Sequence, residues 1–382
     1  MRVLHIFTNP HLTNGASIFE YRLSRLLKDK DIFFDYLVTE QETEEEKSRY
    51  EAEGSRVYHL DADNKRGLII REIKLNRQYK KFFREHSYDI VYCDTENPLR
   101  AIHLMMAKKT GIPVRVVHSH NNSMQTKSKI SRILSRVIKR FFKYSATDYL
   151  ACSEAAAKWL FPGKIYKNKQ YRIISNGIDA EGFAFAPEWR RKIRGKYGLS
   201  DNDMVVGSVA RLMPQKNHEF MFRIIGEIRK TVPDVRLLCV GEGDLEEQLR
   251  CQVRELGIED NVIFAGTAPD VNHYYSAMDV YLMPSLFEGF GIAALEAQAN
   301  GLPCILSDRI SGAVDMGERV AFVSLEENAA VWAKRVTDEF RERRDGKSAR
   351  EIMRQKGYSI ENTANVMYEL YLSWAARGSK KC

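Results

Sequence analysis

The chain has few cysteines and no apolar run that approaches the length of a membrane span. Its six cysteines include no pair with CxxC spacing, so neither a disulfide framework nor a cysteine zinc site is indicated. A membrane-spanning helix needs ~20 apolar residues. The opening MRVLHIF runs into polar TNPHLTNG, which differs from a signal peptide. We therefore expect a soluble, cytoplasmic protein, with core positions for Cys93, Cys152, Cys239 and Cys304.

The length and charge of the chain suggest two domains and an anionic partner. The 382 residues exceed the size of one ordinary core, and a hydrophobic content of 44% is enough to fill two. The net charge of +8 is unevenly spread along the sequence. Such a charge favours binding to a nucleotide, a membrane surface or a nucleic acid.

Apolar runs of strand length alternate with amphipathic helical segments, and the pattern occurs twice. This order predicts an α/β protein with two doubly wound parallel-sheet domains, 1–180 and 181–358, facing a central cleft. We place a linker at 180–203, where strand signals are weak. The expected strands are 2–7, 33–38, 56–60, 89–93, 114–120 and 148–152, followed by 204–210, 235–241, 261–266, 280–285 and 302–307.

Two cations follow the first predicted strand of the second half. In SVARLMPQKNHEF (208–220), Arg211 and Lys216 lie in the loop after the strand. A guanidinium can contact an oxyanion through two donors, and an ammonium adds a point charge. Together they suit a diphosphate without a metal ion, although two exposed loop cations would give the same sequence.

The stretch EGFGIAALEA (288–297) combines two acids with a glycine-rich turn. The predicted strand before it and the helix after it make this a strand-to-helix junction. Glycines let backbone N–H groups approach a ligand, and a helix N-terminus attracts phosphate. Carboxylates such as Glu288 and Glu296 bind the hydroxyls of sugars well, because each accepts two hydrogen bonds. Alternatively, Glu288 is an ordinary turn residue and Glu296 an ordinary solvated residue of the helix, and neither binds a ligand.

These motifs resemble the retaining glycosyltransferases of family four, which have the two-domain GT-B fold. EGFGIAALE looks like the Glu-x7-Glu motif of that family, and ARLMPQKNH resembles its diphosphate-binding loop. The stretches 150–160, 174–179 and 240–249 are similar to other recurring segments. The closing helix, about 359–378, resembles the one that crosses back onto the N-terminal domain. HSHN (118–121) and the basic helices further resemble the capsule and exopolysaccharide branch.

The resemblance implies roles for residues of the second half. Arg211 and Lys216 would bind the donor diphosphate, Glu288 the donor sugar and Glu296 the ribose. No metal ligand is implied, and no Asp-x-Asp cluster appears in these loops. The nucleotide pocket would be completed by Gly241, Glu242, Thr267, Val271, Gly289, Phe290, Gly291 and Ile292.

In the first half, the resemblance points to a glycine loop and a histidine. Gly15 precedes a predicted helix, in the place of the family loop under the donor phosphates, although Asn14 stands where a second glycine is common. His118 and His120 end a strand on the same side. We favour His120 as the residue beside the transferred sugar, and a structural histidine is the alternative.

Two basic stretches lie in the half expected to bind the acceptor. KSKISRILSRVIKRFFK (127–143) has apolar residues at helical spacing and seven cations without an acid, and 71–86 is also basic. A basic amphipathic helix can lie on an anionic bilayer. Each could instead be a core-facing helix with a solvated face. A lipid-linked acceptor on the inner membrane face, carried on a polyprenyl diphosphate, would explain the placement.

We therefore predict a retaining transfer from a nucleoside-diphosphate sugar, expected to be a UDP-sugar, to a hydroxyl of a glycan. An epimerase on the same fold is the first alternative, since it would bind the same donor. A dinucleotide oxidoreductase would need GxGxxG after the first strand, where the sequence reads TNPHLTNGAS. A nucleic-acid binder would use the basic stretches, but the chain contains no recognised binding module.

Overall fold

The computed structural model covers the whole chain and shows two compact units. It describes every residue except 8–9, 13–14, 63–67, 96–97, 121–136, 269, 289, 318, 341–345 and 380–382. Unit 1 comprises Met1–Gly177 and Ile360–Cys382, and unit 2 comprises Ile178–Ser359. Unit 2 begins at Ile178 and ends at Ser359, and these two residues form a parallel β-bridge. Ile178 N–H donates to the Tyr358 carbonyl at 2.9 Å.

Unit 1 contains a seven-stranded parallel sheet with the order β3-β2-β1-β4-β5-β6-β7. The order reverses between β1 and β4, which makes this the topological switch point. Its strands are β1 Arg2–Ile6, β2 Phe33–Val38, β3 Val57–His59, β4 Ile90–Asp94, β5 Val114–Ser119, β6 Asp148–Ala151 and β7 Arg172–Ile173. Its helices include α1 Gly15–Lys28, α2 Glu44–Ala52, α3 Leu68–Glu85, α4 Arg100–Lys109, α6 Phe142–Ser145, α7 Glu154–Leu160, α8 Gly163–Lys167 and α16 Ile360–Ser379.

Strand alternation divides the core of unit 1 into two layers. Val3 packs in a cluster with α1 and α16, whereas Leu4 and Ile6 pack in a cluster with α3 and α4. Apolar residues on both faces explain why these strands are nearly continuous in hydrophobic sequence. Helix α16 therefore closes the first core, although it lies at the end of the sequence.

Unit 2 repeats the same topology with six parallel strands in the order β10-β9-β8-β11-β12-β13. Its switch point lies between β8 and β11. The strands are β8 Val205–Val209, β9 Arg236–Val240, β10 Val262–Phe264, β11 Val280–Met283, β12 Cys304–Ser307 and β13 Val320–Val323. The helices are α9 Pro187–Lys196, α10 His218–Ile228, α11 Glu246–Glu255, α12 Asn272–Ala277, α13 Ile292–Ala299, α14 Ala329–Glu339 and α15 Lys347–Gln355.

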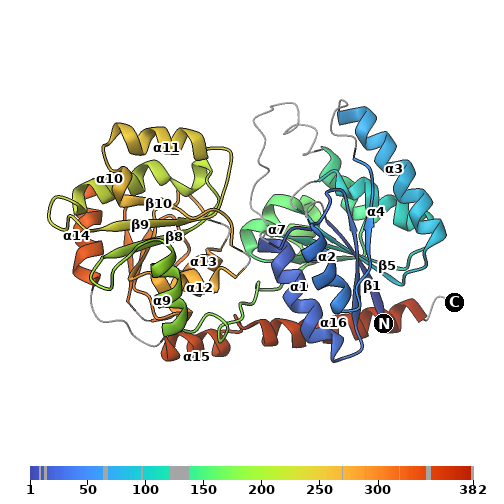
Figure 1. Cartoon of the computed structure of the whole chain (residues 1–382). Coiled ribbons are helices and arrows are strands. Elements are labelled where there is room, and N and C mark those ends of the chain that lie inside the picture. The colour runs from blue at the N-terminus through green and yellow to red at the C-terminus, as the bar shows by residue number, and fades with distance from the viewer. Residues whose placement is uncertain are drawn as a thin grey trace. The chain divides into compact units, whose positions relative to one another are not determined.

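Helices cover both faces of the unit 2 sheet (Figure 1). Phe222 of α10 and Trp332 of α14 pack on one face, and Tyr275 of α12 and Met353 of α15 pack on the other. The four cysteines expected in the core are buried. No described helix is long and apolar enough to cross a membrane.

Three parts of the sequence-based description differ from the structure. The predicted linker at 180–203 belongs to unit 2 and contains α9, which packs against α12. The short edge strands β7 and β13 had no clear sequence signal. Most of the basic stretch 127–143 lies outside the described residues, and its last part forms a 3₁₀ turn, Lys139–Phe141, and the one-turn helix α6.

Candidate functional site

The loop after β8 brings cations to the carboxyl end of the unit 2 sheet. A 3₁₀ turn, Pro214–Lys216, follows the strand, and Asn217 adopts the left-handed conformation at φ 58° before α10 begins. The Arg211 side chain is exposed, and it makes no hydrogen bond or ion pair with another described residue. Its guanidinium is therefore available to a ligand.

Lys216 and Glu288 form an ion pair between the loops after β8 and β11. The Lys216 ammonium donates to Glu288 Oε1 at 2.8 Å. Only 17% of the Lys216 side chain and 8% of the Glu288 side chain are exposed. The alternative of two exposed loop cations therefore does not hold for Lys216, because Glu288 holds its ammonium close to the protein.

Backbone contacts tie these two loops together beside the ion pair. Leu286 N–H donates to the Gln215 carbonyl at 2.9 Å, and the Gln215 amide donates to the Phe287 carbonyl at 2.8 Å. The Asn217 amide donates to the Pro284 carbonyl at 3.1 Å. Since β8 and β11 are neighbours at the switch point, the two loops form one surface where ligands of such sheets commonly bind.

Gly241 lies against the start of the loop between β8 and α10, residues 210–217, which we call the cation loop. A larger residue at this position would force the backbone to move. The φ of Gly241 is 134°, and an added Cβ would lie 2.2 Å from the Ala210 carbonyl oxygen. Leu212 N–H donates to the Glu242 carbonyl at 2.9 Å, which fixes the exposed Glu242 beside the loop. The sequence motif VGEG therefore has a steric reason, because only glycine allows this backbone approach.

The glycine turn leads directly into α13. Gly291 is the N-cap, with φ 91°, and Ile292 is the first helical residue. Phe290 is partly buried and lies 5.1 Å from the Tyr358 ring, centroid to centroid. Gly289 lies outside the described residues. The helix thus begins where the sequence motif placed it, and its first N–H groups lack intrahelical partners, as in any α-helix.

Glu296 lies in the fifth position of α13 and is held by a neighbour from α12. The buried Tyr275 hydroxyl donates to Glu296 Oε2 at 2.7 Å. Burial, and then the charge of Glu296, raise the pKa of Tyr275 well above its ordinary value, so the hydroxyl remains a donor. Thr267 is exposed, and Val271 precedes α12 and packs on the core.

His218, the first residue of α10, is buried directly beside the cation loop. Neither ring nitrogen has a hydrogen-bond partner among the described residues. Burial, and secondarily the charge of Lys216, lower the pKa of His218 to about 4. The ring is therefore neutral at physiological pH.

In unit 1, the two candidate histidines differ in exposure. His120 keeps 8% of its side chain exposed and contacts Asp94 Oδ1 through Nε2 at 2.7 Å. His118 is fully buried, and its Nδ1 lies 2.7 Å from the Tyr92 hydroxyl. Of the two, His120 has the only surface that a ligand could touch. Gly15 is the first residue of α1, and the loop residues 13–14 before it are not described.

A group of buried polar side chains surrounds His120 at the switch point of unit 1. His5 Nδ1 lies 3.0 Å from Glu20 Oε2 and 3.6 Å from Asp94 Oδ2. Burial lowers the pKa of His5, but the charges of Glu20 and Asp94 outweigh this and raise it to about 9. Burial also raises the pKa of Asp94, and its contact with His120 reverses the shift, so Asp94 is ionised.

Sequence reasoning missed several of these partners. The expected strand 89–93 stopped one residue before Asp94, although an acid at the carboxyl end of a parallel strand is a recognisable signal. Tyr275 and Glu20 lie within helices and contact the site only through tertiary packing. Their roles had no local signature.

Two family models match consecutive parts of the chain. The model described as Glycosyltransferase Family 4 matches residues 13–181, and the model described as Glycosyl transferases group 1 matches residues 190–359. Together they span most of both units.

Relatives and solved structures point in the same direction. EpsF of Bacillus subtilis, named as a glycosyltransferase, is 28% identical over 97% of this chain and 96% of its own. An Escherichia coli UDP-Gal:alpha-D-GlcNAc-diphosphoundecaprenol alpha-1,3-galactosyltransferase is 29% identical over 63% of each chain. The crystal structure of Anabaena HepE in complex with UDP and glucose has a TM-score of 0.75 at 19% identity, covering 98% of this chain and 100% of that one. The last similarity establishes the fold.

Proposed function

The chain belongs to glycosyltransferase family four and has the GT-B fold, and we propose that it transfers a hexose from a UDP-sugar to a hydroxyl of a lipid-linked glycan. We further propose that the configuration of the anomeric carbon is retained and that the product contributes to a surface polysaccharide. The observation that carries the proposal is the Lys216–Glu288 pair, which joins a cation loop to a glycine turn at the switch point of unit 2.

The cation loop would stabilise the leaving diphosphate. Negative charge develops on the departing phosphate oxygen as the glycosidic bond breaks. Arg211, Lys216 and the first N–H groups of α13 would contact this charge without a metal ion at the diphosphate. Donors that are already in position stabilise a transition state more than mobile solvent does.

The two acids of the motif would hold the sugars of the donor. Glu288 is kept in place by Lys216 and would accept hydrogen bonds from the transferred sugar. Glu296 is oriented by Tyr275 and would accept from the ribose hydroxyls. Gly241, Glu242 and the stretch Thr267–Val271 would border the nucleotide, as would Gly289, Phe290, Gly291 and Ile292. Carboxylates suit this task because they offer only acceptors to hydroxyl donors.

Unit 1 would bind the acceptor and make one contact to the donor sugar. His120 would lie beside the transferred sugar, and Gly15 at the start of α1 would approach the donor phosphates. The departing phosphate oxygen would take the proton of the acceptor hydroxyl, which is consistent with retention without a protein nucleophile. Holding both substrates in place supplies the proximity term of catalysis.

A UDP-sugar is the donor best supported by the relatives. HepE was crystallised with UDP and glucose, and the E. coli relative is named for UDP-Gal and a diphosphoundecaprenol acceptor. The named relatives are transferases, which favours transfer over epimerisation.

An anionic membrane surface is the proposed site of acceptor capture. Helix α3 exposes Ile70 and Ile73, and the segment before β6 exposes Phe141 and Tyr144. Exposed cations accompany both, including Lys80, Lys81, Arg84, Arg140 and Lys143. Apolar residues beside cations favour a headgroup interface.

The transfer step is tested with Lys216→Ala. Acceptor-dependent UDP release should fall by about 10²–10³ in kcat/KM, because a diphosphate contact is lost at the transition state. Lys230→Ala is the matched control, since Lys230 is exposed and forms an i,i+3 ion pair with Glu227 within its own segment. If the Lys216→Ala enzyme turns over as fast as the control, the proposed contact between Lys216 and the diphosphate is rejected. Conversion of the UDP-sugar without any acceptor would favour the epimerase.

The membrane surface is tested with vesicles of phosphatidylglycerol and of phosphatidylcholine. Arg140→Glu combined with Lys143→Glu should weaken binding to the anionic vesicles by at least about tenfold. Lys334→Glu combined with Arg335→Glu reverses two exposed charges on α14 of unit 2 and should leave binding unchanged. Equal loss in both double variants would mean that the effect is net charge alone.

A further inference from the structure

Four side chains from three elements of unit 1 converge on one buried point. Glu20 comes from α1, Asp94 from the end of β4, and His118 and His120 from the end of β5 and the residue beyond it. One ligand atom from each residue lies within 4.8 Å of the other three. The exposed fraction of these side chains ranges from 0% for His118 to 8% for His120, so the group is enclosed.

Several atoms of this group are buried without a hydrogen-bond partner in the described part of the chain. They include both carboxylate oxygens of Glu20, Oδ2 of Asp94 and Nε2 of His118. A buried polar atom without a partner is costly, and in native proteins it commonly marks an ion or a water. All of these orphaned atoms are acceptors or potential metal ligands.

Histidines face both carboxylates of the group. His5 Nδ1 lies 3.0 Å from Glu20 Oε2 and 3.6 Å from Asp94 Oδ2, and His120 Nε2 lies 2.7 Å from Asp94 Oδ1. These contacts leave Glu20 Oε1 and His118 Nε2 buried without a hydrogen-bond partner among the described residues.

The surrounding structure already orients the proposed ligands. His118 Nδ1 contacts the buried Tyr92 hydroxyl at 2.7 Å, so an Nδ1–H tautomer leaves the lone pair of Nε2 for the cluster. Asp94 and His118 are directly opposed in the β4–β5 ladder, which fixes their separation. Such outer contacts are typical of histidine ligands in metalloproteins.

We propose that Glu20, Asp94, His118 and His120 bind one divalent transition-metal ion. Two imidazoles and two carboxylates suit Zn²⁺ or Mn²⁺, whereas Ca²⁺ and Mg²⁺ prefer oxygen ligands alone. This metal site lies in unit 1, whereas the proposed diphosphate contacts, Arg211 and Lys216, lie in unit 2. The metal proposal therefore does not rest on the proposed function. The ion would fix the ring of His120, the partly exposed member of the group.

The test uses the full chain, purified without a metal-chelating resin. Metal content is measured by plasma mass spectrometry, and the chelator-treated protein is titrated with Zn²⁺ and with Mn²⁺ by calorimetry. We expect one ion per chain and a higher melting temperature after metal is restored. Glu20→Gln combined with His118→Gln should weaken binding by at least about tenfold.

The control removes a second buried histidine–carboxylate pair of the same unit. His103 Nε2 lies 3.1 Å from Glu72 Oε2 outside the cluster, and Glu72→Gln combined with His103→Gln should keep the full metal content. A wild-type protein that binds neither ion and shows no thermal response would overturn the proposal. Equal metal binding by the cluster variant would overturn it as well, and the wild-type titration remains decisive if that variant does not fold.

Discussion

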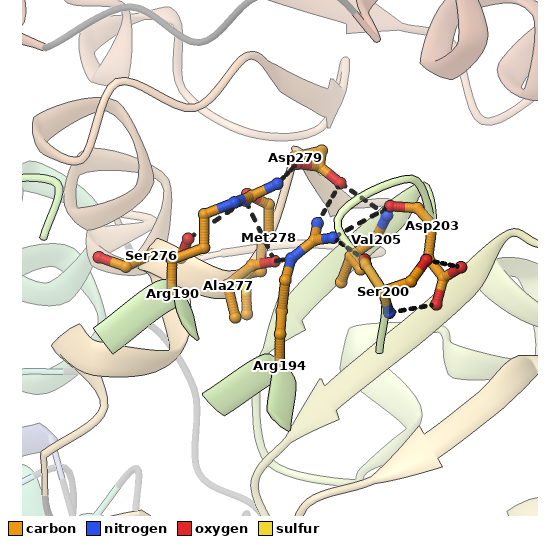
Figure 2. Close-up of polar contacts among 9 residues, drawn as sticks. All are labelled: Arg190, Arg194, Ser200, Asp203, Val205, Ser276, Ala277, Met278 and Asp279. Atoms are coloured by element: carbon orange, nitrogen blue, oxygen red, sulfur yellow. Dashed lines mark hydrogen bonds and ion pairs between the residues drawn. The ribbon is translucent and has the colours of Figure 1, made fainter. Parts of the chain in front are cut away.

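The two ends of strands β8 and β11 carry ion pairs with different surroundings. At the amino end, Asp279 contacts Arg190 at 2.8 Å and Arg194 at 2.6 Å and accepts from Val205 N–H at 2.8 Å (Figure 2). Arg194 also donates to the carbonyls of Ala277 and Ser200 and is 2% exposed. At the carboxyl end, Lys216 and Glu288 lie beside the exposed Arg211.

The difference separates a structural ion pair from a ligand site. At the amino end, the guanidinium groups of Arg190 and Arg194 donate to backbone carbonyls and to Asp279. These bonds anchor α9 to the sheet and occupy donors that a ligand would need. The carboxyl end combines a partly exposed pair with an exposed guanidinium and with glycines at positive φ, Gly241 and Gly291. The switch-point rule assigns ligands to this second end.

Breaking the amino-end cluster should give the largest change in stability. Asp279→Ala leaves the buried Arg194 guanidinium without its carboxylate, and a lost partner of a buried pair costs about 3–5 kcal/mol. Urea unfolding should show this loss, whereas Arg190→Ala should cost less because that side chain is 22% exposed. Equal losses in the two variants would show that burial does not set the strength of this cluster.

A bulkier residue at the carboxyl end of the unit 2 sheet should cost less stability than Asp279→Ala, but it should weaken binding of the donor more. Gly241→Ala places a methyl group against the Ala210 carbonyl, and the strain of its positive φ adds about 1–3 kcal/mol. Gly257→Ala is the control, since its φ is 62° and, apart from its chain neighbours, no described atom lies within 4 Å of the added Cβ. If both variants bind UDP equally well, the close approach at Gly241 has no part in the site.

Acid should weaken unit 2 through His218. Its folded pKa of about 4 lies below the ordinary 6.5, so the unfolded chain binds a proton more readily between these values. Stability is therefore complete above pH 6.5 and falls as the pH approaches 4. Melting temperatures at pH 7 and pH 5 should differ more in the wild type than in His218→Leu. An identical pH response would mean that the ring is solvated.

The spacing of apolar residues along the sequence, and the points where apolar runs end, made much of the fold predictable. The first expected strand, 2–7, overlaps β1 because its apolar residues alternate between two covered faces. The edge strand β7 has only two residues, both exposed, and therefore carries no hydrophobic pattern. Helix α9 was missed because its mostly charged sequence buries only Ile193 and Arg194.

The candidate site was predictable where a motif is local. Glu288, Gly291 and Glu296 lie in one strand–turn–helix segment, and the structure builds that segment as expected. The Lys216–Glu288 contact joins residues 72 positions apart and depends on the adjacency of β8 and β11. The unit 1 cluster depends on packing of α1 over β4 and β5, which no short pattern records.

Equilibrium binding of UDP tests the central claim, that the carboxyl-end loops of unit 2 hold the donor diphosphate. Calorimetric titration of the wild type should show one site per chain, and Arg211→Ala combined with Lys216→Ala should abolish it, with a cooperative urea transition showing that the variant is still folded. Asp279→Asn should retain UDP binding even where it lowers stability. UDP affinity equal to the wild type in the Arg211 and Lys216 double variant would contradict the account.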